Sequence, residues 1–276
     1  MVARAVRANR QSQHGGQAAV VSAPANQTPA LEFGAATDRG RVRPHNEDSI
    51  LADPVHGFAL LADGVGGYNA GEVASHMAVT VIAEGLRAAL QERQSHPAAP
   101  DIASLLQHEI EATNAAIYYA GASHPVYSGM ATTVVAAVFH DDRVTVGHVG
   151  DSRLYRLRAG ELQALTRDHS VVQEQIDRGV LSPQAARRSP SRHLITRALG
   201  NEPTVQAELR EYPLAPGDLY LLCSDGLFNA VEEDAIRQTL EGHADLHAAA
   251  QHLVRMANEN GGWDNVSVIL VRTAPP

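Results

Sequence analysis

The sequence predicts an α+β fold with largely antiparallel sheets, and two observations support this prediction. Strand patterns occur in groups on both sides of a pair of consecutive helices, and the chain lacks the strict strand–helix alternation of a parallel sheet. With 276 residues, 44% of them hydrophobic, the chain is long enough to bury a large core.

The first half of the pattern contains two strands and two helices. The runs SILADP and GFALLAD, residues 49–54 and 57–63, have the length and apolar content of strands joined by a turn. Apolar residues then recur at helical spacing over residues 71–93, and the stretch HPAAP ends this helix. Residues 102–120 repeat the helical spacing, so a second amphipathic helix follows.

The second half begins with three strands, at residues 131–139, 143–151 and 152–158, the last of which ends at the turn Ala159-Gly160. Residues 170–200 are polar and mix helical with loop patterns. A strand at 219–225, helices near 232–240 and 245–260, and a strand at 265–271 complete the domain.

The N-terminal residues differ in composition from the rest of the chain. Residues 1–30 are rich in Gln, Ala, Pro and Gly, lack periodicity, and contain no acidic residue before Glu32. We therefore predict a disordered tail over residues 1–30 and a folded domain over residues 31–274.

Composition excludes several classes of function. A net charge of −9 argues against a non-specific nucleic-acid binder, and no uninterrupted apolar run reaches the length of a membrane span. All 22 basic residues are Arg, which excludes Schiff-base lysines and the GxxxxGK[ST] phosphate loop. The single cysteine, Cys223, lies in an apolar run, as expected for a core thiol rather than a nucleophile. No disulfide is possible within the chain, so we predict a cytoplasmic protein.

Acidic residues stand at the ends of the predicted strands. They end or precede apolar runs, and they are Glu47, Asp48, Asp63, Asp151, Asp225 and Asp264. A single Asp-Gly pair is more often a hairpin turn, and the glycines of DGVGG are also typical of a phosphate-binding loop. The whole group instead indicates carboxylates that converge on a cation, because like charges brought together repel unless they are neutralised. Oxygen ligands favour Mg²⁺ or Mn²⁺, and the zinc patterns HExxH and CxxC are absent.

The segments around these acids also occur in a known order. They are TDRGRVRPHNEDS, ADGVGGYNAGEVAS, SGMATTVV, VGHVGDSRLYRL, LTRDHS, LITRALG, LLCSDGLFNAV and GGWDNVSVILV. Over about residues 34–272 the chain thus resembles the metal-dependent serine/threonine protein phosphatases, the PPM or 2C type, in their bacterial form. The resemblance implies a four-layer αββα sandwich of two antiparallel β-sheets flanked by helices, with a small flap near residues 170–200. It also implies that residues 31–274 are the PPM-type catalytic domain.

The same resemblance implies the metal ligands. Asp63 bridges two ions, Mn²⁺ or Mg²⁺, and the carbonyl of Gly64 and the carboxylate of Glu47 bind one of them. Asp225 and Asp264 bind the other ion. A metal-bridging hydroxide then attacks the phosphoryl group in line, without a phosphoenzyme, on phosphoserine or phosphothreonine in proteins. Such an enzyme reverses a serine/threonine kinase, and we expect it to be a monomer.

Further roles follow from the resemblance, and some positions depart from it. Asp48 matches an acid that orients bound water, Asp151 the ligand of a possible third ion, and Arg43 the arginine that holds the substrate phosphate. Many eukaryotic relatives carry a histidine, proposed as the general acid, where this chain has Val65, so the proton donor is left unassigned. Three histidines, His45, His148 and His169, are not assigned to that role.

The flap also departs from the family, since Ser189-Pro190 replaces a frequent His-Pro pair. The arginines of the flap either engage a phosphoprotein or form a solvated helical face; they are Arg178, Arg187, Arg188 and Arg192. Two other functions compete with the phosphatase: a non-catalytic module that binds phosphoproteins, and a two-metal phosphodiesterase or nuclease. The complete set of acids opposes the first, and the negative net charge opposes the second.

Overall fold

Two antiparallel sheets form the centre of the molecule. The computed structural model describes residues 30–66, 70–95, 100–187 and 189–274, so nearly all of the predicted tail lies outside the described residues. The five-stranded sheet has the order β1 (Leu31–Asp38), β11 (Val266–Thr273), β10 (Leu219–Cys223), β7 (Arg153–Arg158) and β8 (Glu161–Ala164). The six-stranded sheet has the order β2 (Asp48–Asp53), β3 (Phe58–Val65), β5 (Val134–His140), β6 (Arg143–Val149) and β9 (Glu208–Pro213), and β4 (Ala131–Thr132) pairs with the end of β3.

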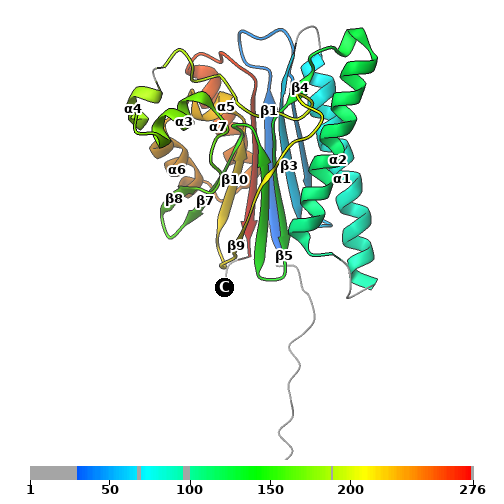
Figure 1. The fold of residues 1–276 in the computed structure, drawn as a ribbon. Coiled ribbons are helices and arrows are strands. Elements are labelled where there is room, and N and C mark those ends of the chain that lie inside the picture. The colour runs from blue at the N-terminus through cyan, green and yellow to red at the C-terminus, as the bar shows by residue number, and fades with distance from the viewer. Residues whose placement is uncertain (1–29, 67–69, 96–99, 188, 275–276) are drawn as a thin grey trace, which may run out of the picture.

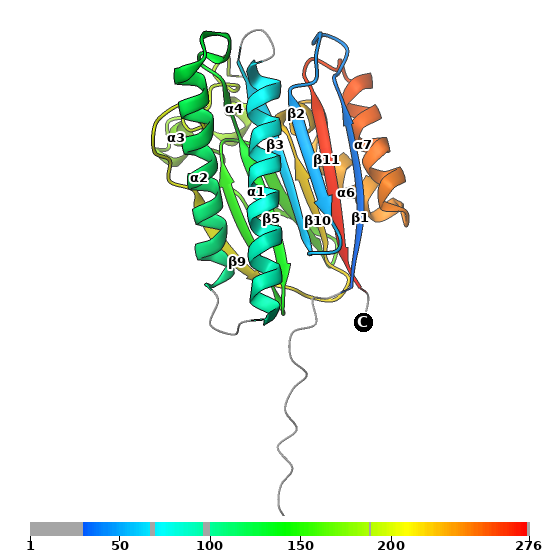
Figure 2. The same cartoon turned by 90° about the vertical axis from the view of Figure 1, so that its right-hand side faces the viewer.

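Helices cover the outer face of each sheet, as Figures 1 and 2 show. The long helices α1 (Ala70–Ser95) and α2 (Ile102–Ser123) pack on the six-stranded sheet, and α6 (Glu233–Gly242) and α7 (Leu246–Glu259) pack on the five-stranded sheet. The short elements are η1 (Pro125–Tyr127), α3 (Val171–Asp177), α4 (Pro183–Ala186) and α5 (Asp225–Phe228). The arrangement confirms the α+β class and the αββα sandwich.

The alternation of side chains along the strands creates three hydrophobic layers. In β3, Phe58 and Leu60 point toward the helices, while Leu61 points into the layer between the two sheets. In β10, Cys223 packs against the helical side and Tyr220 between the sheets. Strands that are buried on both faces read as continuous apolar runs, which is why the sequence identifies them so readily.

Cys223 is completely buried, and burial raises the pKa of its thiol. Because the thiolate is the reactive form, this thiol is chemically quiet under ordinary conditions. The structure agrees with the prediction of a core cysteine.

Helix α1 differs from one expectation. Among the described residues it is long and apolar enough to cross a membrane, with a mean hydropathy of 1.2 over Ala70–Arg93. A window average tolerates the polar residues that interrupt its apolar runs, so a search for unbroken runs misses it. In the fold the helix buries a row of apolar side chains against the six-stranded sheet: Ala74, Ala78, Ile82 and Leu86.

The predicted strand at 131–139 is divided at Thr133, where the side-chain Oγ1 rather than the backbone carbonyl accepts a hydrogen bond from the N–H of Asp63, at 2.9 Å. The prediction of a strand at 219–225 was wrong at its end, since Asp225 begins α5.

Three strands had no clear pattern in the sequence: β1, β8 and β9. All three are edge strands with a partly exposed face, so they lack the unbroken apolar run of a central strand.

Candidate metal centre

The acids predicted from the sequence meet at one end of the sandwich, the upper end in Figure 1. Strands β3, β6 and β10 end there, and β2 and β11 begin there. A cavity of about 480 Å³ opens between the two sheets at this end. Every candidate residue except Asp48 lines it: Arg43, Glu47, Asp63, Gly64, Asp151, Asp225 and Asp264.

Two glycines allow the chain segments to approach closely in this cavity. A Cβ on Gly64 would lie 2.2 Å from the carbonyl oxygen of Gly71, at the start of α1. A Cβ on Gly226 would lie 1.9 Å from the carbonyl oxygen of Asn265. The glycine after each of these aspartates is therefore required by a backbone contact between distant segments, and not by a hairpin turn.

Asp63 lies at the centre of the group of carboxylates. Burial raises its pKa well above the ordinary value, and the neighbouring carboxylates of Asp48, Asp225, Asp151 and Asp264 raise it further. Its hydrogen bonds within the described part of the chain use the backbone N–H and C=O, which face the Thr132–Thr133 segment. The carboxylate thus faces the cavity with several like charges around it.

Asp48 lies behind the cavity, opposite Asp63 in the β2–β3 register, and is 8% exposed. The hydroxyl of Ser224 donates a hydrogen bond to its Oδ2 at 2.8 Å, whereas its Oδ1 has no partner among the described residues. Burial raises the pKa of Asp48 to about 7. The unpartnered oxygen marks a place where the site is incomplete without another polar group.

The other acids complete the ring around the cavity. Burial raises the pKa of Asp151 well above its ordinary value, with the charge of Asp225 as the next cause. Burial also raises the pKa of Glu47, although the nearby charge of Arg43 opposes the rise. The amide of Asn229, one turn after Asp225, donates to the Oδ2 of Asp225 at 3.0 Å.

Arg43 joins the loop after β1 to the other side of the cavity. Its Nη2 donates a hydrogen bond to the Oδ2 of Asp264 at 2.7 Å, and this bond is the main cause of its raised pKa. The side chain is half exposed, so the remaining N–H groups are available to a ligand at the cavity mouth.

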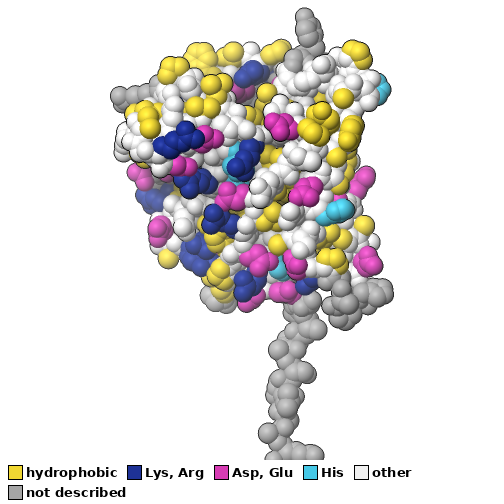
Figure 3. Space-filling model, in the orientation of Figure 1, with side chains coloured by type: hydrophobic (Ala, Val, Ile, Leu, Met, Phe, Trp, Pro, Cys, Tyr) yellow, Lys and Arg dark blue, Asp and Glu magenta, His cyan; other side chains and the backbone are white. Residues whose placement is uncertain are grey.

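The flap covers one side of the cavity. Arg192, His193 and Ile195 line it, and the Nδ1 of His193 lies 3.5 Å from the Oδ2 of Asp225. Of the other flap arginines, Arg178 pairs with Glu174, Arg187 pairs with Glu232, and Arg188 lies outside the described residues. Figure 3 shows arginine side chains on the half of this face that contains α3 and α4, mixed with acidic ones.

Several residues of the site were not identified from the sequence: His193, Asn229, Trp263 and Asn265. Asn265 is the clearest case, because its Oδ1 accepts from the backbone N–H of Glu47 at 2.8 Å and its amide donates to the carbonyls of Arg39 and His45. Its position directly after Asp264 was a local signal. Nothing local indicated His193 or Trp263.

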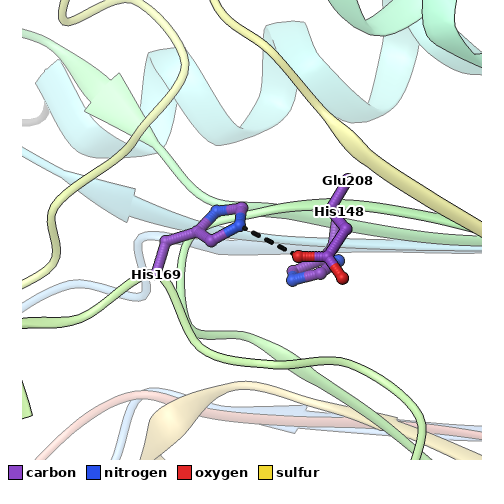
Figure 4. A group of neighbouring side chains, drawn as sticks. All are labelled: His148, His169 and Glu208. Carbon is purple, nitrogen blue, oxygen red and sulfur yellow. Dashed lines mark ion pairs between the residues drawn. The ribbon is translucent and has the colours of Figure 1, made fainter. Parts of the chain in front are cut away.

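The unassigned histidines lie elsewhere, since the cavity lining includes none of them. His148 and His169 are stacked, with ring centroids 4.7 Å apart, and Glu208 lies beside them (Figure 4). The ligand atoms of these three residues lie within 4.8 Å of one another. However, the Nδ1 of His169 already accepts from the N–H of Gly150 at 3.2 Å, and its Nε2 lies 3.4 Å from the Nη1 of Arg197 and 3.7 Å from the Oε2 of Glu208. The permanent positive charge of Arg197 beside the ring opposes a bound cation. This cluster is therefore better suited to hydrogen bonding than to holding a metal ion.

The cavity fits a divalent cation on chemical grounds. Its acidic groups present oxygen atoms, and the pKa values of Asp63 and Asp151 are raised by burial and, further, by repulsion from neighbouring carboxylates. Carboxylates and carbonyl groups are the ligands that Mg²⁺ and Mn²⁺ prefer. A bound cation would remove the repulsion that the carboxylates otherwise experience.

Known proteins share this fold and much of this sequence. The serine/threonine phosphatase Stp of Listeria welshimeri is 38% identical over 238 residues, which are 85% of this chain and 93% of that protein. The crystal structure of the serine/threonine phosphatase PstP/Ppp of Mycobacterium tuberculosis superposes with a TM-score of 0.79 at 37% identity, and covers 88% of this chain and 99% of that chain. A structure of the PstP catalytic domain in complex with 2 manganese ions has a TM-score of 0.78 at 36% identity, with 88% and 98% of the two chains covered. Residues 40–262 match the family described as protein phosphatase 2C, and the chain belongs to that family.

Proposed function

We propose that this protein is a Mn²⁺- or Mg²⁺-dependent phosphatase that hydrolyses phosphoserine and phosphothreonine in proteins. The observation that carries the proposal is the convergence of carboxylates from both sheets on one cavity, with Asp63 at its centre. The similarity to proteins named serine/threonine phosphatases supports the reaction class.

We assign the metal ligands as follows. Asp63 would hold both ions, the carbonyl of Gly64 and the carboxylate of Glu47 would hold one, and Asp225 and Asp264 would hold the other. Their common position in the cavity supports this assignment, as does the manganese complex of the related PstP domain. Asp151 lines the same cavity and is assigned to a third, weaker ion. When bound, such ions activate water for attack on phosphorus and neutralise charge on the phosphoryl oxygens.

Two residues of the chain act on the substrate and on the attacking water. Arg43 holds phosphoryl oxygens with N–H groups that Asp264 leaves free, and thereby fixes the direction of attack. Asp48 accepts a hydrogen bond from water through its Oδ1, for which the described residues provide no partner, and so orients that water. Val65 lines the cavity at the position where the family resemblance places the histidine of many eukaryotic relatives, and its side chain has no proton to donate.

The partners follow from this activity. The substrates are phosphoproteins, and a serine/threonine kinase makes the phosphoester bonds that this enzyme removes. We propose that the enzyme works in the cytoplasm as a monomer. Light scattering of the purified chain tests the monomer, and dephosphorylation of a kinase encoded in the same genome tests the pairing.

The activity is tested by phosphate release from a phosphothreonine peptide. Protein stripped with EDTA is assayed with and without added Mn²⁺, beside the variants Asp63→Asn and Asp225→Asn. The exposed Asp142→Asn, whose carboxylate is 87% exposed, is a matched control for loss of one negative charge. We expect turnover that Mn²⁺ restores in wild type and in the control, and losses of about 10³-fold or more in the two site variants. Folded wild-type protein without metal-dependent turnover would refute the proposal.

A further inference from the structure

The only tryptophan of the chain lies at the mouth of the cavity. Trp263 is 72% exposed and lines the cavity directly beside Asp264. An indole combines a large apolar surface with one N–H donor, and tryptophan is enriched at binding interfaces for this reason. Its position beside a metal-ligand candidate makes a bound substrate the natural partner.

Two glycines hold the indole in place. Gly261 has a φ of +127°, and a Cβ there would lie 2.2 Å from the Nε1 of Trp263, so the ring rests directly on the backbone of Gly261. Gly262 has a φ of +54°, and its carbonyl accepts a hydrogen bond from the N–H of Arg41 at 2.7 Å. One side of the ring is thus packed against rigid backbone while most of its surface remains free, which lowers the entropic cost of binding.

The indole also lies close to the place where the substrate phosphate would be held. Arg43 donates to the Oδ2 of Asp264, and Trp263 is the residue before Asp264. In an extended peptide, consecutive residues are about 3.3–3.6 Å apart along the chain. A phosphoresidue bound at Arg43 therefore brings a flanking side chain within reach of the ring.

The surroundings of the ring select the chemistry of that flanking side chain. Arg41 and Arg43 lie on the loop that packs against residues 262–264, and each pairs with a carboxylate, Arg41 with Asp38 and Arg43 with Asp264, so their charges do not draw an acidic side chain to the ring. The negative face of the ring opposes a carboxylate. Val42, between the two arginines, and Val65 at the cavity wall are both exposed and apolar.

We propose that Trp263 determines substrate specificity by stacking on an aromatic or large apolar side chain next to the phosphoserine or phosphothreonine. The inference rests on the proposed phosphatase function and adds the class of phosphopeptide that the site prefers. Trp263 binds the substrate and takes no part in the chemical step.

Steady-state kinetics test the preference. Phosphothreonine peptides that differ only in having Phe or Gly on one side of the phosphoresidue, prepared for each side in turn, are compared with wild type, Trp263→Ala and Trp263→Phe. We expect wild type to favour one Phe peptide by about tenfold in kcat/KM, mainly through KM, which corresponds to about 1.4 kcal/mol. Trp263→Ala brings the ratio close to one, and Trp263→Phe retains part of it.

A control variant removes an exposed apolar side chain elsewhere. Val55, in the turn between β2 and β3 at the opposite end of the sandwich, is 84% exposed. Val55→Ala is expected to keep the wild-type ratio. An unchanged ratio in Trp263→Ala would overturn the proposal, and so would equal rates of wild type on all the peptides.

Fluorescence gives a direct readout, because all tryptophan emission comes from Trp263. Titration of the Mn²⁺-loaded protein with a non-hydrolysable phosphonate version of the preferred Phe peptide is expected to shift or quench the emission, and the Gly peptide to do so much less. No difference between the two peptides would refute stacking. If wild type hydrolyses no peptide, the proposed function fails, and the fluorescence titration still decides the role of Trp263.

Discussion

Replacement of Asp48 by Asn should make the metal-free protein more stable while it damages the enzyme. Asp48 is 8% exposed, one of its oxygens has no partner among the described residues, and burial raises its pKa from the ordinary 3.8 to about 7. For a carboxyl whose folded-state pKa is raised, the associated stability is fully present below the unfolded-state pKa and is lost as the pH rises through the folded-state pKa. Above about pH 7, ionised Asp48 therefore destabilises the fold.

The magnitude follows from the same numbers. A rise in pKa from 3.8 to about 7 corresponds to about 4 kcal/mol in the free energy of unfolding. Water in the adjacent cavity and relaxation of the other carboxylates reduce this, and we expect a gain of about 2 kcal/mol for Asp48→Asn at pH 8. Asparagine keeps an acceptor for the hydroxyl of Ser224, so the hydrogen bond at 2.8 Å is retained.

Thermal unfolding in EDTA measures this effect. At pH 8 the variant should melt about 4–8 °C above wild type, and at pH 4.5 the difference should shrink, because wild-type Asp48 is then protonated. The control Asp142→Asn, at a carboxylate that is 87% exposed, should change the melting temperature by less than about 2 °C. A variant less stable than wild type at pH 8, or an equal gain at both pH values, would refute the reasoning.

Three further predictions concern the cavity and its support. Arg43→Lys should lower kcat/KM on a phosphothreonine peptide about 10²-fold, because an ammonium group does not reproduce the planar fork that binds two oxygens, and Arg43→Met should lower it further. Gly226→Ala should lower the free energy of unfolding by about 3 kcal/mol in chemical denaturation, because the new Cβ would lie 1.9 Å from the carbonyl oxygen of Asn265, and unchanged stability would count against this contact. Burial lowers the pKa of His169 to about 4, so its stability contribution is present above about pH 6.5 and lost as the pH falls through about 4. Between pH 7 and pH 4, the free energy of unfolding measured with urea should fall by about 2 kcal/mol less in His169→Asn than in wild type, after allowance for partial solvation of the ring. If the free energies of wild type and variant fall in parallel with pH, the lowered pKa of His169 does not contribute to stability.

Most residues of the candidate site could be predicted from the sequence, because their signal lies in neighbouring residues of the chain. Asp63 and Asp225 each follow a run of residues that is buried on both faces, so the end of the strand and the acid are visible together. Strands without such a run, among them β8 and β9, gave no comparable signal. They are held by pairing with β7 and β6, and that pairing is a property of the sheet rather than of their own residues.

The sequence by itself determined the fold class, the positions of the central strands and long helices, and the acids that end or precede the strands, because these depend on periodicity and on nearest neighbours. Only the tertiary structure decided which side chains share the cavity. Asp63 lies near the end of β3 in one sheet, Asp225 begins the helix that follows β10 of the other sheet, and His193 and Trp263 reach the cavity from the flap and from the loop before β11. The proximity of these side chains depends on how two twisted sheets pack through a common apolar layer, and no local pattern of residues encodes the distance between the two sheets.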